Sequence, residues 1–242
     1  MTAVGIISDI HLRDDHSEAI IESLNAIQDT MSTTHEIAHI FVLGDLIEDS
    51  DSQTDRHHIE LIQSLFADWD SPVTYLLGNH DILTLSTDLL SDTLKQDTFQ
   101  GIQMVAGQPF VYLDSTAAGI ANRGRIGPKQ RGWLAESLPD GAIVLSHHPL
   151  GQFSLADNVW FQTYPERGRV WDRKEVLDII ADRARVTISG HIHQSSQCSF
   201  RGLQHFSVNA VSKETPSKPV SGNYAVLSVA DAGTVQLERN LV

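Results

Sequence analysis

The sequence predicts an α/β fold in which buried strands alternate with amphipathic helices. Apolar runs at Ala3–Ile7, Ile37–Leu43 and Val73–Leu77 have the length and composition of buried strands. Between them, Ser17–Met31 and Asp55–Trp69 carry apolar residues at the spacing of helices that bury one face, and Ser17 stands where it would cap the first. This βαβαβ order implies a parallel sheet with right-handed crossovers.

The rest of the chain is predicted to extend this fold. Gly151–Gly168 carries aromatic residues without periodicity, so we expect a long loop there, and such loops are often functional. The other expected elements are hairpins or a sheet edge between Phe99 and Leu113, helices over Pro128–Leu138 and Asp172–Arg183, strands over Ala142–Leu145 and Val186–Ser189, and consecutive antiparallel strands over Gln197–Leu241. No repeat or linker is present, so we expect a single domain over residues 1–242.

The composition is strongly acidic, with 17 Lys and Arg against 31 Asp and Glu and a net charge of −14. Nucleic acid is therefore an unexpected partner, because binding its backbone needs a basic face. A small anionic substrate remains compatible, since bound cations supply a local positive field. We expect no membrane span, because no apolar run approaches roughly 20 residues. The absence of a signal-peptide pattern and the single cysteine favour a cytoplasmic location.

Five short motifs with metal-binding side chains each follow an expected strand. They are Ser8-Asp9-Ile10-His11, Gly44-Asp45, Gly78-Asn79-His80-Asp81, Ser146-His147-His148-Pro149 and Gly190-His191-Ile192-His193. Strand carboxyl ends are where open α/β sheets bind ligands, and carboxylates with imidazoles suit Mn, Fe, Co or Zn. Each motif alone is more typical of a turn, a helix cap or a surface histidine. Their occurrence at five strand ends together favours a metal site.

Alternate side chains of an extended segment point to the same side, which gives two of these motifs an expected geometry. We expect Asp9 and His11 to converge on one point, and His191 and His193 to face the same side. Asp45, aimed by the tight turn at the preceding glycine, is the natural carboxylate to bridge two ions.

The motif after the third strand has a different expected division of roles. Asn79 offers a neutral carbonyl oxygen as a ligand, which leaves His80 to face the substrate. Asp81 is expected to hydrogen-bond an imidazole and so to support the ligands from behind. For Glu48 and Asp49, the sequence leaves two alternatives, which are support of the ligands and a position at the surface.

In these motifs and in their order, the chain resembles the calcineurin-like metallophosphoesterase superfamily. The resemblance runs from Asp9 to His193 and implies a four-layer αββα sandwich, with two mixed sheets flanked by helices and the site between the sheets. It also implies two metal ions, of Mn, Fe or Zn, and a role for His80 in stabilising the transition state or protonating the leaving group. The implied ligands are Asp9, His11, Asp45 and His193 for the first ion, and Asp45, Asn79, His147 and His191 for the second.

Other stretches point to a branch of that superfamily. Asp81 stands where protein Ser/Thr phosphatases typically carry Glu, and no Arg-Gly follows Asp49, which points away from those enzymes. The stretches Leu113-Asp114-Ser115, Gly124-x-Ile126, Gln130 and Trp133-Leu134, with the His-His-Pro turn, are similar to the class III cyclic nucleotide phosphodiesterase and glycerophosphodiesterase group. The layout is also similar to manganese-dependent ADP-ribose/CDP-alcohol diphosphatases.

The expected function is hydrolysis of small phosphodiesters or nucleotide pyrophosphates, by attack of a hydroxide shared between two metal ions. A phosphomonoesterase or a nuclease of the same fold is an alternative. A non-catalytic interaction module is another, which the presence of all seven ligand positions disfavours.

Several residues outside the ligand set are expected to bind the small phosphorylated substrate. They are His148, Arg123, Arg125 and Tyr164, with Asn122 near a second phosphate. Aromatic side chains of the long loop are expected to stack on a base or cover an alcohol group. The alternative is that these aromatic residues pack the loop onto the body and the arginines lie at the surface. The sequence does not predict an oligomeric state.

Overall fold

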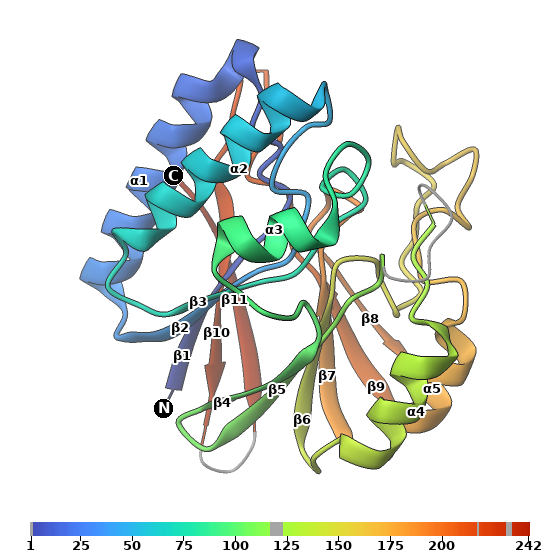
Figure 1. The fold of residues 1–242 in the computed structure, drawn as a ribbon. Coiled ribbons are helices and arrows are strands. Elements are labelled where there is room, and N and C mark those ends of the chain that lie inside the picture. The colour runs from blue at the N-terminus through green and yellow to red at the C-terminus, as the bar shows by residue number, and fades with distance from the viewer. Residues whose placement is uncertain (1, 117–122, 217, 231–233) are drawn as a thin grey trace.

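The computed structural model describes residues 2–116, 123–216, 218–230 and 234–242 (Figure 1). Its helices are η1 (Asp14–His16), α1 (Ser17–Thr34), α2 (Ser52–Ala67), α3 (Thr87–Leu94), α4 (Gly127–Ser137) and α5 (Arg173–Ile180). Its strands are β1 (Thr2–Ile7), β2 (Ile37–Val42), β3 (Val73–Tyr75), β4 (Gly101–Val105), β5 (Gln108–Leu113), β6 (Ala142–Ser146), β7 (Ala184–Ser189), β8 (Ser196–Phe200), β9 (Leu203–Ser207), β10 (Asn223–Val229) and β11 (Val235–Leu241).

The strands form two mixed sheets. The first has the order β11-β10-β1-β2-β3, in which β1, β2 and β3 are parallel and the β10–β11 hairpin is antiparallel. The second has the order β4-β5-β6-β7-β9-β8, with β5, β6, β7 and β9 parallel. The expected parallel sheet with its βαβαβ crossovers is therefore present at the start of the chain.

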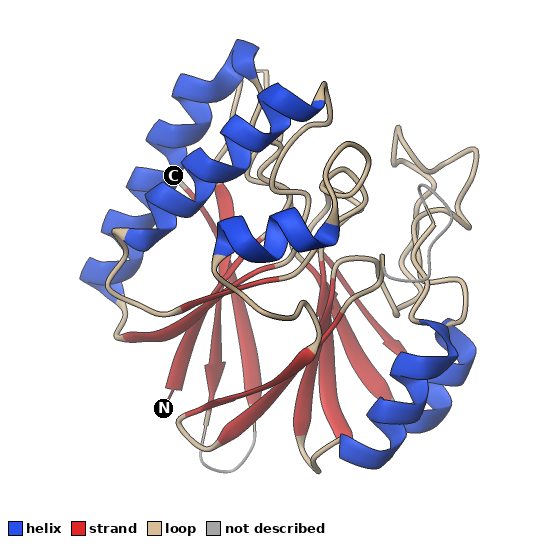
Figure 2. Cartoon of the chain, in the orientation of Figure 1, coloured by secondary structure: helices blue, strands red, loops and turns tan. Residues whose placement is uncertain are grey.

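Three apolar cores separate four layers and confirm the expected αββα sandwich. In one core, α1, α2 and α3 cover the outer face of the first sheet, and in another α4 and α5 cover the outer face of the second (Figures 1 and 2). The third core lies between the sheets, where the rings of Phe41 and Phe110 stack 5.0 Å apart between centroids. Each sheet is thus buried on both faces, which explains the continuous apolar runs of its central strands.

The carboxyl-terminal region differs from the expected run of consecutive antiparallel strands. Two antiparallel hairpins form, but β8–β9 belongs to the second sheet and β10–β11 to the first. Strand β9 also runs parallel to β7, and β10 returns to pair with β1. Local alternation of apolar residues predicts that a strand exists, whereas its partner depends on which distant edge is free to hydrogen-bond.

The helix boundaries differ from the predicted ones by a few residues. Ser17 is the first residue of α1 rather than its cap, and its hydroxyl donates to the carbonyl of Asp14. Helix α2 begins earlier than expected because the carboxylate of Asp51 accepts hydrogen bonds from the backbone of Gln53 and Thr54. Among the described residues, no helix combines the length and the apolar character required to cross a membrane.

Candidate metal centre

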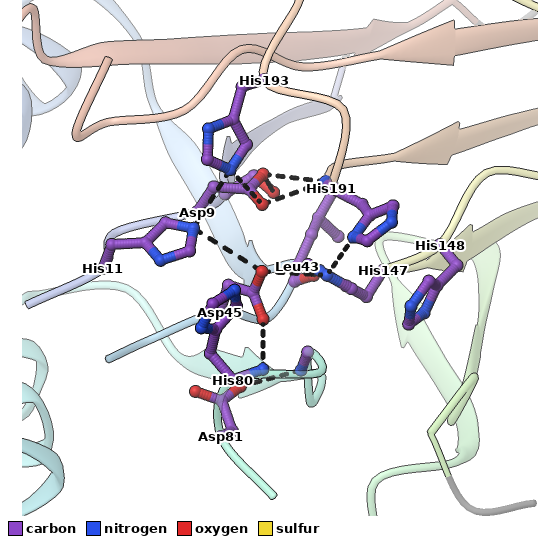
Figure 3. A network of polar contacts seen from close by, with 12 residues as sticks. Asp9, His11, Leu43, Asp45, His80, Asp81, His147, His148, His191 and His193 are labelled. Atoms are coloured by element: carbon purple, nitrogen blue, oxygen red, sulfur yellow. Dashed lines mark hydrogen bonds and ion pairs between the residues drawn. The ribbon is translucent and has the colours of Figure 1, made fainter. Parts of the chain in front are cut away.

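All five sequence motifs lie in turns that follow β1, β2, β3, β6 and β7, and the turns meet where the two sheets face each other (Figure 3). The turns after β1 and β2 continue the pairing of their strands. The backbone N–H of Asp9 donates to Gly44 O at 3.1 Å, and that of His11 donates to Asp45 O at 3.0 Å. This pairing fixes the first two motifs side by side.

Five of the seven expected ligands have left-handed backbone angles. The φ values are 54° for Asp9, 46° for His11, 50° for Asp45, 69° for His191 and 47° for His193. Non-glycine residues rarely adopt such angles, and they gather at functional sites when they do. The extended backbone expected for the first and last motifs is therefore wrong, although Asp9 and His11 do converge on one cluster.

Four of these side chains form one cluster. The ligand atoms of Asp9, His11, Asp45 and His193 all lie within 4.8 Å of one another. His11 Nε2 is 3.0 Å from His193 Nε2, and His193 Nε2 is 3.4 Å from Asp9 Oδ1. Figure 3 shows Asp9, His11 and His193 turned toward one another, although they come from different sheets.

A second cluster consists of imidazoles from the second sheet. Nitrogen atoms of His147, His148 and His191 lie within 4.8 Å of one another, and His191 Nδ1 is 3.2 Å from His147 Nε2. His191 thus belongs to a different cluster from His193, so the extended backbone that would turn both rings to the same side is not what forms here. The left-handed turn sends the two rings to opposite sides of the site.

The carboxylate of Asp45 lies between the two clusters. Its Oδ2 is 3.6 Å from His11 Nε2 and 3.3 Å from His147 Nε2, and its Oδ1 accepts the backbone N–H of His80 at 3.0 Å. Gly78 makes this position possible, because a Cβ there would lie 2.1 Å from Asp45 Oδ1.

Three imidazoles use one ring nitrogen outside the clusters and turn the other inward. His11 Nδ1 is 2.8 Å from Glu48 Oε2. His147 Nδ1 is 2.8 Å from the carbonyl of Leu43, and His191 Nε2 is 3.0 Å from the carbonyl of Arg167. Metal-ligating histidines characteristically donate their second N–H in this way, which fixes the tautomer and the ring.

Asn79 and His80 follow β3 and play different parts. Within the described part of the chain, the buried Oδ1 of Asn79 has no hydrogen-bond partner. An unsatisfied buried oxygen is costly, so a cation is a natural partner for it. The imidazole of His80 contacts the Asp49 carboxylate through Nδ1 and lies edge-on to His11, with ring centroids 4.9 Å apart.

Asp81 does not make its expected contact with an imidazole. Its carboxylate accepts the backbone N–H groups of Gly78 at 2.8 Å, Leu46 at 2.8 Å and Ile47 at 3.3 Å. It therefore ties the turn after β3 to the turn after β2. Glu48 and Asp49 do contact imidazoles, and the sequence left their roles open because only the folded turn places them beside His11 and His80.

Burial and charge shape the protonation of the site. Burial alone raises the pKa of Asp9, but His193 and His147 outweigh it and lower that pKa to about 2. Burial alone lowers the pKa of His147, but Asp45 and Asp9 outweigh it and raise that pKa to about 9. Burial lowers the pKa of His191 to about 3 and holds that of His148 well below its usual value. The carboxylates of Asp9 and Asp45 are thus ionised and attract positive charge.

The donor set fits two metal ions. It combines ionised carboxylates, an unpartnered amide oxygen and imidazoles whose outer nitrogens are fixed, which is the ligand chemistry of first-row transition metals. Gly190 preserves the space, since a Cβ there would lie 1.9 Å from Ser8 Oγ and 2.5 Å from Asp9 Oδ2.

The expected substrate-binding residues lie on the side of the second cluster. His148 is buried, and its Nδ1 is 2.8 Å from Ser115 Oγ. Arg125 is exposed, and its backbone donates to the carbonyl of Ser115. The guanidinium of Arg123 lies 4.0 Å from the ring centroid of Trp171, and Tyr164 is half exposed. Asn122 lies outside the described residues.

The sequence also matches the model of a known protein family. Residues 2–195 match the model of the calcineurin-like phosphoesterases. The chain belongs to the calcineurin-like phosphoesterase family. The matched range contains all five motifs, so the resemblance noted in the sequence is confirmed.

Two relatives of similar sequence are named as phosphodiesterases of cyclic nucleotides. The chain is 28% identical over 197 residues to a cAMP/cGMP dual specificity phosphodiesterase of Mycobacterium tuberculosis, covering 78% of this chain and 57% of the relative. It is 25% identical over 209 residues to a probable cyclic nucleotide phosphodiesterase of Rhodococcus erythropolis, covering 80% and 67%. The chain thus spans about three fifths of the length of the first relative.

Two solved structures share the fold. A dimetal phosphatase from Danio rerio superposes with a TM-score of 0.75 at 15% identity, covering 95% of this chain and 93% of that one. A purple acid phosphatase from yellow lupin seeds gives a TM-score of 0.70 at 14% identity, covering 99% and 51%. At such identities the likeness concerns the arrangement of sheets and helices alone.

Proposed function

We propose that this chain is a two-metal phosphohydrolase that cleaves small phosphodiesters or nucleotide pyrophosphates. The observation that carries the proposal is the position of Asp45, whose one carboxylate contacts an imidazole of each cluster. A carboxylate between two ligand clusters is the arrangement that binds two cations close together.

The proposed ligands follow the two clusters. The first ion takes Asp9, His11, Asp45 and His193, and the second takes Asp45, Asn79, His147 and His191. The mixture of oxygen and nitrogen donors favours Mn, Fe or Zn. When bound, such ions lower the pKa of a coordinated water and neutralise phosphoryl oxygens.

His80 is proposed as the catalytic residue beside these ligands. Its Nδ1 contacts the carboxylate of Asp49, which orients the ring and leaves Nε2 to donate a proton to the leaving oxygen. Its backbone N–H holds Asp45 Oδ1, so the ring and the bridging carboxylate share one turn. Asp81 keeps that turn in place from behind.

The preference for diesters and pyrophosphates rests on the relatives and on the surroundings of the second cluster. The named relatives act on cyclic nucleotides, which are phosphodiesters. In this chain, His148, Arg123, Arg125 and Tyr164 lie on that side and are proposed to contact the substrate. A single-domain organisation and a cytoplasmic location also remain predictions.

Paired substrates test this proposal. With Mn²⁺ restored to metal-free protein, we expect a higher kcat/KM for bis(p-nitrophenyl) phosphate than for p-nitrophenyl phosphate, and for ADP-ribose than for AMP. The Asp45→Asn variant, purified identically, controls for contaminating phosphatases. If both monoesters are cleaved more efficiently than their partners, the enzyme is a monoesterase. If Mn²⁺, Fe²⁺ and Zn²⁺ all leave the protein inactive on all four compounds, the proposal is wrong.

A further inference from the structure

The long segment between β6 and α5 contacts the metal centre at two points. The carbonyl of Arg167 accepts the Nε2–H of His191 at 3.0 Å, and the ring of Phe161 lies 4.9 Å from that of His191 between centroids. The segment is therefore fixed to one proposed ligand of the second ion. Figure 1 shows it as the yellow loops that rise above α4 and α5.

Two aromatic rings beside this contact each carry a guanidinium on one face. Arg123 Cζ lies 4.0 Å from the ring centroid of Trp171, and Arg167 Cζ lies 4.7 Å from that of Tyr164. Trp171 is 62% exposed and Tyr164 is 51% exposed. Rings so exposed, with an arginine on one face, keep most of their remaining surface in solvent.

A short series of contacts links Trp171 to the same histidine. The backbone N–H of Trp171 donates to Gly124 O at 2.7 Å. Gly124 packs against the ring of His148 so closely that a Cβ would lie 2.3 Å from His148 Cγ. The ring of His148 in turn lies 4.3 Å from that of His191 between centroids. Trp171 and Tyr164 are thus both connected to His191, by separate routes.

Positive charge is concentrated in this part of an acidic chain. Eight of the 17 Lys and Arg residues lie between positions 123 and 174, and they are Arg123, Arg125, Lys129, Arg131, Arg167, Arg169, Arg173 and Lys174. A guanidinium stacked on an aromatic face attracts anions while leaving the ring available for stacking. This combination suits a group that is planar, aromatic and attached to a phosphate.

We propose that Trp171, backed by Arg123, stacks on the nucleobase of the substrate, with Tyr164 and Arg167 forming the second side of this base subsite. The inference rests on the proposed function, since the phosphate of the same molecule is placed at the metal ions. It assigns the discrimination between nucleotide diesters and other diesters to these two rings. A diester of two aliphatic alcohols gains nothing from the stacking surface.

A matched pair of substrates isolates the base. Adenosine 3′,5′-cyclic phosphate is compared with the cyclic phosphate of 1-deoxyribose, which differs only in lacking the base. Base–aromatic stacking amounts to about 1–3 kcal/mol. We therefore expect Trp171→Ala to lower kcat/KM for the nucleotide by roughly 10- to 100-fold, and to leave that for the abasic compound unchanged. Trp171→Phe is expected to retain most of the preference.

Trp160 supplies the control, because it lies on the same segment and is 68% exposed, with its backbone bound to Asn158. Trp160→Ala is expected to change neither rate. Equal losses on both substrates in Trp171→Ala, or a loss of preference in Trp160→Ala but not in Trp171→Ala, overturns the assignment.

Calorimetry separates this inference from the proposed function. Wild-type protein with Mn²⁺ is titrated with AMP and with ribose 5-phosphate, and AMP is expected to bind more tightly by a margin that Trp171→Ala removes. If neither cyclic phosphate is hydrolysed but AMP binds more tightly than ribose 5-phosphate in this way, the proposed reaction is wrong and the base subsite stands. If both cyclic phosphates are hydrolysed at the same rate and AMP binds no more tightly than ribose 5-phosphate, the base subsite is wrong and the proposed reaction stands.

Discussion

The turns that follow the strands of the first sheet differ in chemistry from those of the second. The first set carries all of the site's carboxylates, which belong to Asp9, Asp45, Glu48, Asp49 and Asp81. The second set carries imidazoles, at His147, His148, His191 and His193, with arginines beyond them. The first set also carries the imidazoles of His11 and His80, so the acidic side of the site belongs to one sheet while the imidazoles come from both, and neither sheet supplies a complete ligand set.

This division explains how the fold and the metal centre depend on each other. Asp45 of the first sheet contacts His147 of the second, and the ring of His147 donates to the carbonyl of Leu43 across the same boundary. Ions bound between the sheets would add bonds to a boundary otherwise held by the apolar core and by these polar contacts. Substitutions on the two sides should consequently have different effects.

The largest difference is expected between Asp45→Asn and His147→Ala. Because Asp45 contacts both clusters, Asp45→Asn should nearly abolish hydrolysis and lower the content of both metal ions. His147 belongs to one cluster, so His147→Ala should lose one ion and retain the other. Metal analysis beside turnover measures this contrast. A fully loaded Asp45→Asn protein with near wild-type turnover would rule out a bridging role.

The next largest effect is expected at His80, which lies on the acidic side without being a proposed ligand. His80→Ala should lower turnover by roughly 10²–10⁴-fold, the usual contribution of a general acid, with metal content almost unchanged. Loss of one ion would instead make His80 a ligand.

Glu48 and Asp49 are neighbours that contact different imidazoles, so they form a matched pair. Glu48→Gln should weaken binding of the first ion by about 10- to 100-fold through His11, as is typical when the partner of a ligating histidine is changed. Asp49→Asn should lower turnover through His80 without changing that affinity. Metal titrations and kcat, measured on both variants, test the division. Identical behaviour of the two would contradict it.

The smallest effect concerns the proton on His147. Its pKa of about 9 in the metal-free protein means that the ring is protonated at pH 7, because Asp45 and Asp9 outweigh the effect of burial. The second ion must displace that proton, so its affinity should rise about tenfold per pH unit from pH 7 to 9 and then level off. Calorimetry in buffers of different ionisation enthalpy measures the release of one proton. An affinity that does not change over this range would contradict the prediction.

The sequence predicted the strand-end motifs well because each is local. A buried strand ends, a glycine turns the chain, and the polar residue that follows lies at the sheet edge, as at Gly44-Asp45. The order of the first three strands and the two flanking helices follows from the same local patterns. These features need no knowledge of distant residues.

The remaining features depend on contacts between distant residues. Extended backbone would turn His191 and His193 to the same side, whereas their positive φ values show a turn that places them in different clusters. The contacts of Glu48 and Asp49 with imidazoles, and of Asp81 with three backbone amides, arise only when the turns of β1, β2 and β3 pack together. The stacking of Arg123 on Trp171 joins residues 48 positions apart, beyond any local pattern.

The left-handed angles of the ligand turns affect how this family can change over evolutionary time. Each such angle costs a non-glycine residue roughly 1–3 kcal/mol, and five ligands carry one. Glycine adopts these angles without that cost, so replacement of a partly exposed ligand such as His193 by glycine should make the folded chain more stable while removing activity. Only selection for hydrolysis opposes that substitution. Duplicated copies released from such selection would therefore drift toward stable, inactive descendants of the same shape.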